Sequence, residues 1–226
     1  TEALDPQLAV LRGKRPVVLV PVANPGSAAG LIALANAMTP PVAGRVVLLT
    51  ILRKQDAVMK EGDDTPKVLV DAQAVVREAL VTSLTDGCAP ETLITIADDP
   101  WSEMSRVAET RACESMLLGL SVEQEGGARR LEALLNEVDC DVVVLHAPTG
   151  WAPDAVTRVV VPIGGRGGHD TLRARMLGSL GRSADSKVRF VRVLPTKTSE
   201  AERTQARAQL LAFAEEETHR HPEAEV

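Results

Sequence analysis

The chain has 226 residues, of which 45% are apolar and only 2% aromatic, and its formal net charge is −6. An acidic chain without a basic cluster, and with so few aromatic side chains for bases to stack on, is not expected to bind nucleic acid. This length fits one large domain or two ordinary ones, and a core of Val, Leu, Ile and Ala is typical of a parallel sheet covered by helices.

The first part of the chain alternates strand and helix signals. Apolar or alternating runs predict five strands, at 17–22, 45–52, 91–97, 115–120 and 141–146. Helical spacing of apolar residues predicts four helices between them, at 27–38, 65–84, 100–111 and 127–137. We expect Ser27 to cap the first helix and Asp99 the third. Strands that alternate with helices predict an α/β fold, a doubly wound parallel five-stranded sheet with right-handed crossovers.

The same spacing predicts which helical side chains face the core. The expected core positions are Val68, Ala72, Val75, Val76, Ala79 and Leu80 on the second helix, and Leu131, Leu134 and Leu135 on the fourth.

The order of elements restarts after a short joint at Trp151. Pro16 to Val22 reads PVVLVPV and Thr157 to Ile163 reads TRVVVPI, and each run precedes a loop of small residues, an amphipathic segment and a second apolar run. Further strands are predicted at 158–163 and 187–194, and helices at 170–180 and 199–219. Agreement over about 35 residues indicates a duplicated unit. We expect a linker at 1–15, a complete domain at 16–150 and an abbreviated β-α-β-α second copy at 151–226.

This order of elements resembles the universal stress protein fold, which is Rossmann-like. The opening LVPVANPGSAAGLIALANAM is similar to that family's first strand, loop and helix. The segments MLLGL, ARRLEALLNEV and DCDVVVLHAP are similar to its last strand, helix and strand. The resemblance covers most of residues 16–148 and, in shortened form, 157–218.

The phrase RPVVLVPVANPGSAAGLIALA, preceded by TEALDPQLAVLRGKR, more narrowly resembles the C-terminal regions of bacterial amino-acid permeases and cation–proton antiporters. This resemblance implies a non-catalytic regulatory and dimerisation domain on the cytoplasmic side of the inner membrane. Its partners would be a second copy and the membrane-embedded transporter domain of the same polypeptide. The family commonly dimerises along the edge strand, here 141–146, and the charged helix 199–219 is the alternative. A soluble nucleotide-binding stress protein that acts as a sensor is the alternative function.

The resemblance also implies what an ATP site would require. Family members that hold ATP carry an acidic residue after the first strand and a GxxG(x9)G[ST] loop after the fourth. Ala23 and Gly164 stand at the acidic position of the two copies, and the fourth-strand loop GLSVEQEGG has Val122 in place of its second glycine. We therefore expect no cofactor, with ATP or another nucleotide as the alternative.

A glycine-rich loop in the second copy is the candidate ligand site. Its residues are Gly164, Gly165, Arg166, Gly167, Gly168 and His169, between a predicted strand and a predicted helix. Their backbone amides can form an anion nest, to which the arginine and histidine add positive charge. A tight turn without a ligand is the alternative interpretation. The loop from Asn24 to Ser27 is the weaker equivalent in the first copy.

The sequence predicts neither a catalytic constellation nor a metal site. Asp98 and Asp99 suit an acid–base or Mg²⁺ role, but turn formation and helix capping explain them equally well. We interpret His146 as an edge residue, and Trp101 and Trp151 as side chains that pack over edges. His219 and His221 are expected to lie in a solvated tail. Cys88, Cys113 and Cys140 are expected to be reduced thiols, with a redox switch as the alternative.

Overall fold

The computed structural model describes residues 16–39, 44–55, 67–85, 90–119, 127–162, 176–177 and 187–218. The chain divides into two compact units, Thr1–Ala152 and Pro153–Val226. None of the helices in these ranges combines the length and the apolar character that a membrane span requires.

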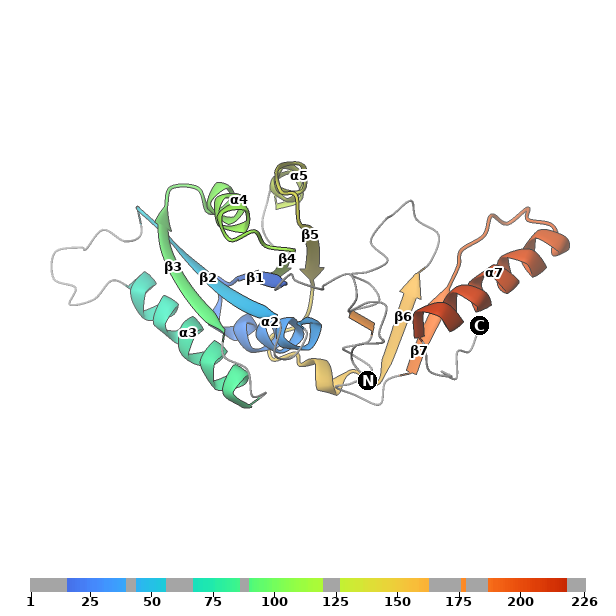
Figure 1. Cartoon of the computed structure of the whole chain (residues 1–226), viewed down its shortest axis with the longest axis horizontal. Helices are drawn as coiled ribbons and strands as arrows, with labels where there is room; N and C mark the ends of the chain where they lie inside the picture. Colours follow the sequence, from blue (N-terminus) through green and yellow to red (C-terminus); the bar gives the residue numbers. More distant parts are fainter. Residues whose placement is uncertain are drawn as a thin grey trace. The chain divides into compact units, whose positions relative to one another are not determined.

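A five-stranded parallel sheet forms the centre of the first unit (Figure 1). Its strands are β1 (Val17–Pro21), β2 (Arg45–Arg53), β3 (Glu91–Ala97), β4 (Ser115–Gly119) and β5 (Asp141–Leu145). They lie in the order β3-β2-β1-β4-β5, and every neighbouring pair is parallel. The predicted doubly wound sheet is confirmed. Because the chain winds outward in both directions from β1, the strand order reverses between β1 and β4.

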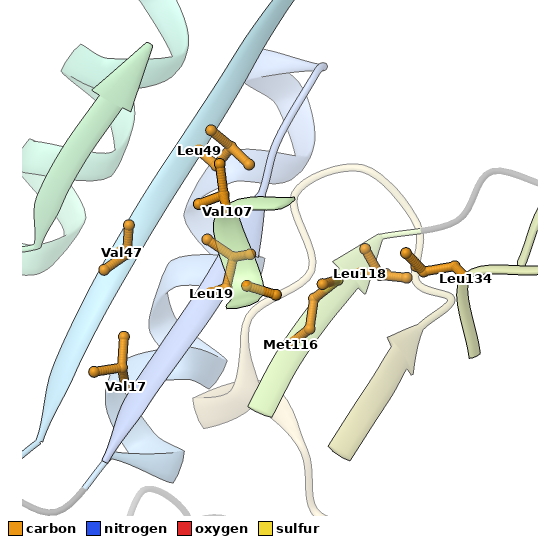
Figure 2. Packing of buried hydrophobic residues seen from close by; sticks show 9 residues of the cluster. Val17, Leu19, Val47, Leu49, Val107, Met116, Leu118 and Leu134 are labelled. Carbon is orange, nitrogen blue, oxygen red and sulfur yellow. The ribbon is translucent and has the colours of Figure 1, made fainter. Parts of the chain in front are cut away.

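Helices cover both faces of this sheet. They are α2 (Pro25–Met38), α3 (Lys67–Thr85), α4 (Pro100–Thr110) and α5 (Gly127–Glu137). The helices α2 and α3 pack together on one face, and α4 and α5 lie on the other (Figure 1). Successive residues of each strand point to opposite faces of the sheet, so alternate side chains pack against the helices of each face. Figure 2 shows the α4–α5 side, where Leu19 of β1, Leu49 of β2 and Met116 of β4 lie near Val107 of α4 and Leu134 of α5.

The burial of two leucines corrects the expected helix faces. On α5, Leu134 is 1% exposed and packs into the core, whereas Leu135 is 51% exposed. Leu131 and Val138 pack against the same cluster as Leu134. This three-to-four-residue spacing defines a narrow stripe, and Leu135 lies one residue, about 100°, beyond Leu134. The expectation was also wrong for Leu80 of α3, which is 39% exposed although Ala72, Val75 and Ala79 are buried.

The first residue of α2 differs from the expectation. The helix begins at Pro25, so its cap is Asn24, whose side chain accepts a hydrogen bond from the Gly26 amide. A proline fits the first helical position because its missing N–H would have no partner there. Ser27 therefore lies inside the first turn, where its hydroxyl donates to the Asn24 carbonyl over 3.0 Å.

Asp99 caps α4 as the sequence predicts. Its carboxylate accepts hydrogen bonds from the Trp101 amide at 3.4 Å and the Ser102 amide at 3.0 Å. The Ser102 hydroxyl donates to it as well, over 2.6 Å. These bonds, that of the Ser102 hydroxyl foremost, lower the pKa of the Asp99 carboxyl below its ordinary value of 3.8.

Replacing Asp99 by alanine should lower the free energy of unfolding by about 1 kcal/mol, because the first amides of α4 lose their acceptor. Asp99→Asn should retain most of this stability. The folded-state pKa lies below the unfolded one, so the charged cap stabilises the fold above about pH 4 and this contribution is lost as the pH falls through the folded-state pKa.

Thermal unfolding at several pH values measures both effects. The difference between the wild type and Asp99→Asn should shrink below about pH 4. Asp98→Asn is the matched control, because the neighbouring carboxylate is exposed and makes only a surface ion pair with Lys54. An equal loss of stability at Asp98 and Asp99 would contradict the assignment of the cap.

In its described residues the second unit contains two parallel strands and a long helix. They are β6 (Arg158–Pro162), β7 (Lys187–Val191) and α7 (Glu200–Thr218), and a single turn of 3₁₀ helix, Pro153–Ala155, precedes them. Val161, Phe190 and Leu210 form a small core with Leu177. Of the predicted helix 170–180, only 176–177 lie among the described residues, and these two are helical.

A capping box begins α7. The Ser199 hydroxyl accepts a hydrogen bond from the Glu202 amide, and the Glu202 carboxylate accepts one from the Ser199 amide over 2.9 Å. On the helix α7, Ala206 and Leu210 are buried, whereas Leu211 is 38% exposed, so its apolar face is narrow.

Candidate functional site

A crevice of about 420 Å³ lies at the point where the strand order reverses. In open α/β sheets this position, at the carboxyl ends of the strands, is where ligands bind. The crevice is formed by the end of β1, the first turns of α2, and the segment that follows β5. Its described lining comprises Pro21, Val22, Ala23, Asn24, Gly26, Ser27, Gly30, Leu31, Gly119, Leu145, His146, Ala147, Pro148, Thr149, Gly150 and Trp151.

The amino terminus of α2 points its first amides toward this region, but the chain itself occupies them. Pro25 has no N–H. The Gly26 amide donates to the Asn24 side chain over 2.9 Å, and the Ser27 amide donates to the Asn24 carbonyl over 3.1 Å. A helix amino terminus binds anions through such amides only when they remain available. These two amides are therefore not offered to a phosphate group.

The segment after β5 packs against the same helix. The carbonyl oxygen of Trp151 lies 2.5 Å from the position that a Cβ atom would take on Gly30, and the indole ring lies 3.3 Å from it. Thr149 approaches Gly26 in the same way, with its methyl carbon 3.2 Å from the corresponding position. Only glycine at position 30 admits a backbone this close. The segment 146–151 thus lies over the first two turns of α2, on one wall of the crevice.

The described lining carries almost no charge. It contains no Asp, Glu, Lys or Arg, and His146 is its one titratable side chain. Ala23 is exposed at the rim, at the position where the resemblance calls for an acidic residue. The described part of the crevice therefore offers hydroxyl, amide and apolar groups, and a highly charged ligand would find no counter-ion among them.

Both carboxylates of the Asp98–Asp99 pair have structural partners. Asp98 forms an ion pair with Lys54 over 2.6 Å, and Asp99 caps α4. Among the residues that the structure describes, no group of three His, Cys, Asp or Glu side chains is arranged to hold a metal ion. These partners favour the structural interpretation, turn formation and helix capping, over an acid–base or Mg²⁺ role.

Two of the cysteines lie near each other beneath α4 and α5, at the amino edge of the sheet. Cys113 precedes β4 and Cys140 precedes β5, and both line a second hollow of about 440 Å³. Burial, with a smaller contribution from the nearby Cys140, raises the pKa of the Cys113 thiol to about 11. Burial also raises the pKa of Cys140. Both thiols are therefore protonated near neutral pH and are weak nucleophiles.

Several predicted site residues lie outside the described part of the chain. They are the glycine-rich loop Gly164–His169, the fourth-strand loop with Val122, and Cys88, His219 and His221. Sequence reasoning assigned no role in the crevice to Thr149 or Trp151. The available signal was Gly30, a glycine in the middle of a predicted helix, which commonly marks close packing of another backbone.

Comparisons with known proteins identify the fold. No protein-family model matches the chain, and no curated protein matches it. Solved structures do match. A universal stress protein from Archaeoglobus fulgidus DSM 4304 is 15% identical, with a TM-score of 0.53 over 88% of this chain and 73% of that one.

Two shorter proteins match with lower TM-scores. A universal stress protein family member from Burkholderia pseudomallei is 21% identical, with a TM-score of 0.41 over 60% of this chain and 98% of that one. A universal stress protein in complex with cAMP is 14% identical, with a TM-score of 0.45 over 59% and 98%. The match to the Archaeoglobus protein establishes that this chain has a universal stress protein-like α/β fold.

Proposed function

We propose that this chain is a non-catalytic regulatory and dimerisation domain of a bacterial membrane transporter of the amino-acid permease or cation–proton antiporter type. The observation that supports the regulatory part is the lining of the crevice: where this fold takes a ligand, the chain's own segment 146–151 forms one wall and the described lining offers no charged partner for a phosphate. Such a domain acts through its contacts with other protein surfaces rather than through a bound substrate.

The chemistry of the crevice supports this proposal against a nucleoside triphosphate site. A triphosphate needs available amides or cations around its oxygens. Here the first amides of α2 bind Asn24, and the described lining holds neither Lys nor Arg. Ala23, in place of an acidic residue, removes the acceptor that a ribose or base would use.

The second unit is proposed to be an abbreviated second copy, from 151 to 226, after a first copy at 16–150. Its parallel strand pair, β6 and β7, matches the start of the first sheet, β1 and β2, in direction. The alignment with the Archaeoglobus structure covers 88% of this chain, more than the first unit alone, and supports the same idea. Within this copy, the loop Gly164–His169 is the proposed anion site, with Arg166 as its cation.

The proposed attachment to a transporter rests on the resemblance of the opening segment to transporter C-terminal regions. An antibody raised against this chain tests it on fractionated source cells. The proposal predicts a band in the inner-membrane fraction that is much heavier than this chain, because about 20 apolar residues are needed for each span of the remaining polypeptide. A band of this chain's own mass in the soluble fraction would instead favour the free-standing nucleotide sensor.

A further inference from the structure

The strand β3 forms one edge of the sheet. Its inner side pairs with β2 from Glu91 to Ala97, and no strand of the described residues pairs with its outer side. Proteins usually protect such an edge with lysine, proline or a bulge, since its open backbone groups are a template for another strand. The sequence ETLITIA contains none of these protecting residues.

Exposed apolar side chains continue from this edge onto the neighbouring helix. Six large ones are between 39% and 71% exposed: Ile94 and Ile96 on β3, and Val70, Leu80, Val81 and Leu84 on α3. A groove of about 330 Å³ runs between the two elements, with Ile94 on one wall and Leu80, Val81 and Leu84 on the other. We call the groove together with these six exposed side chains the β3–α3 groove. Contiguous exposed apolar surface of this kind marks an interaction site.

We propose that the β3–α3 groove is the surface on which a second copy of this chain docks, with β3 antiparallel to its counterpart. The sequence of β3 is self-complementary about Ile94. A twofold axis there places Ile94 opposite Ile94 of the second copy, Thr92 opposite Ile96, and Glu91 opposite Ala97. No like charges face each other, which is the requirement for an isologous strand pair.

The charges at the two ends of β3 are complementary across this axis. At its amino end, Glu91 binds Arg111 over 2.7 Å and Arg45 over 3.6 Å. At its carboxyl end, Lys54 and Asp98 form an exposed pair. Antiparallel docking brings the amino end of one strand beside the carboxyl end of the other. The two arginines then approach Asp98 of the second copy, and Glu91 approaches its Lys54.

The helix α3 adds to the same interface. An axis perpendicular to the sheet leaves the α3 helices of both copies on one face, antiparallel and adjacent. Their exposed Leu80, Val81 and Leu84 can then meet across the axis. The helix α3 has 19 residues and is therefore about 28 Å long, so it accompanies the whole length of β3. By contrast, Val144 is the one large side chain that the opposite edge, β5, exposes by more than a third.

This inference deepens the proposed dimerisation by naming a surface other than the expected edge strand 141–146 or helix 199–219, and it rests on that part of the proposed function. Sedimentation equilibrium of the whole chain, at up to about 100 µM, tests it. Ile96→Lys should raise the dimer dissociation constant about 100-fold, as expected when an apolar contact next to the axis is replaced by a charge in both copies. Leu84→Glu should act in the same direction. It keeps the test valid if the strand does not tolerate lysine, because Leu84 is 71% exposed on a helix.

Two controls separate this surface from the others. Leu135→Glu changes a leucine that is 51% exposed on the opposite face, and Val144→Lys changes the β5 edge; neither should weaken the dimer. A wild-type dimer that resists Ile96→Lys and Leu84→Glu but dissociates on Val144→Lys would overturn this inference and leave the proposed dimerisation standing. A wild type that is monomeric throughout the concentration range would overturn both.

Discussion

Replacing Leu134 by alanine should lower the free energy of unfolding of the first unit by about 3 kcal/mol. Leu134 of α5 is 1% exposed and lies beside Leu118 (Figure 2), in the buried cluster to which Val107 also belongs. Removing its terminal atoms loses their transfer free energy and leaves a cavity that the surrounding core cannot fill completely. For a unit of this size the midpoint of thermal unfolding should fall by roughly 6–12 °C.

Leu135→Ala is the matched control, because the same substitution is made one residue away on the same helix. Leu135 is 51% exposed, so its truncation should cost less than about 0.5 kcal/mol. The better helix propensity of alanine offsets part of that loss. Equal losses at both positions would mean that both leucines face the core, as the sequence alone predicts, and would contradict the orientation of α5.

Replacing Gly30 by alanine should destabilise the first unit by about 1–3 kcal/mol, although alanine is otherwise the better helix former. The new Cβ would lie 2.5 Å from the carbonyl oxygen of Trp151, a backbone atom that cannot turn away. Either the helix or the segment 146–151 must move. Trp151 should then become more exposed to water.

Tryptophan emission in a Trp101→Phe background, where Trp151 is the remaining tryptophan, reports this movement together with thermal unfolding. A red shift and a lower midpoint are expected for Gly30→Ala. Gly26→Ala is the control, since its Cβ would meet only the Thr149 methyl carbon at 3.2 Å and Asn24 at 3.4 Å. A gain in stability at Gly30, with unchanged emission, would mean that the segment does not pack on α2.

The sheet could be predicted from the sequence because each of its strands has a local pattern of apolar residues. The run at 17–22 is continuously apolar, and 91–97 alternates, and each became a strand with almost the expected bounds. Asp99 was predicted correctly for the same reason: a cap is a local feature of chain and side chain.

What escaped prediction depends on contacts between distant parts of the chain. Both Leu134 and Leu135 satisfy helical spacing. Which of them is buried depends on the direction in which α5 faces the sheet. The covering of α2 by Trp151 joins residues about 120 positions apart in sequence. The exposed face of α3 could not be predicted either, because Leu80 follows the same spacing as the buried Val75 and Ala79.

From the uncharged lining of the crevice we expect that the first unit does not bind ATP. Calorimetric titration of ATP into the Arg166→Ala chain isolates that claim, because the substitution disables the proposed anion loop of the second unit. We expect no saturable heat, corresponding to a Kd weaker than about 1 mM. Stoichiometric binding with a micromolar Kd in this variant would contradict this expectation, since the crevice would then accept a nucleotide despite its uncharged described lining.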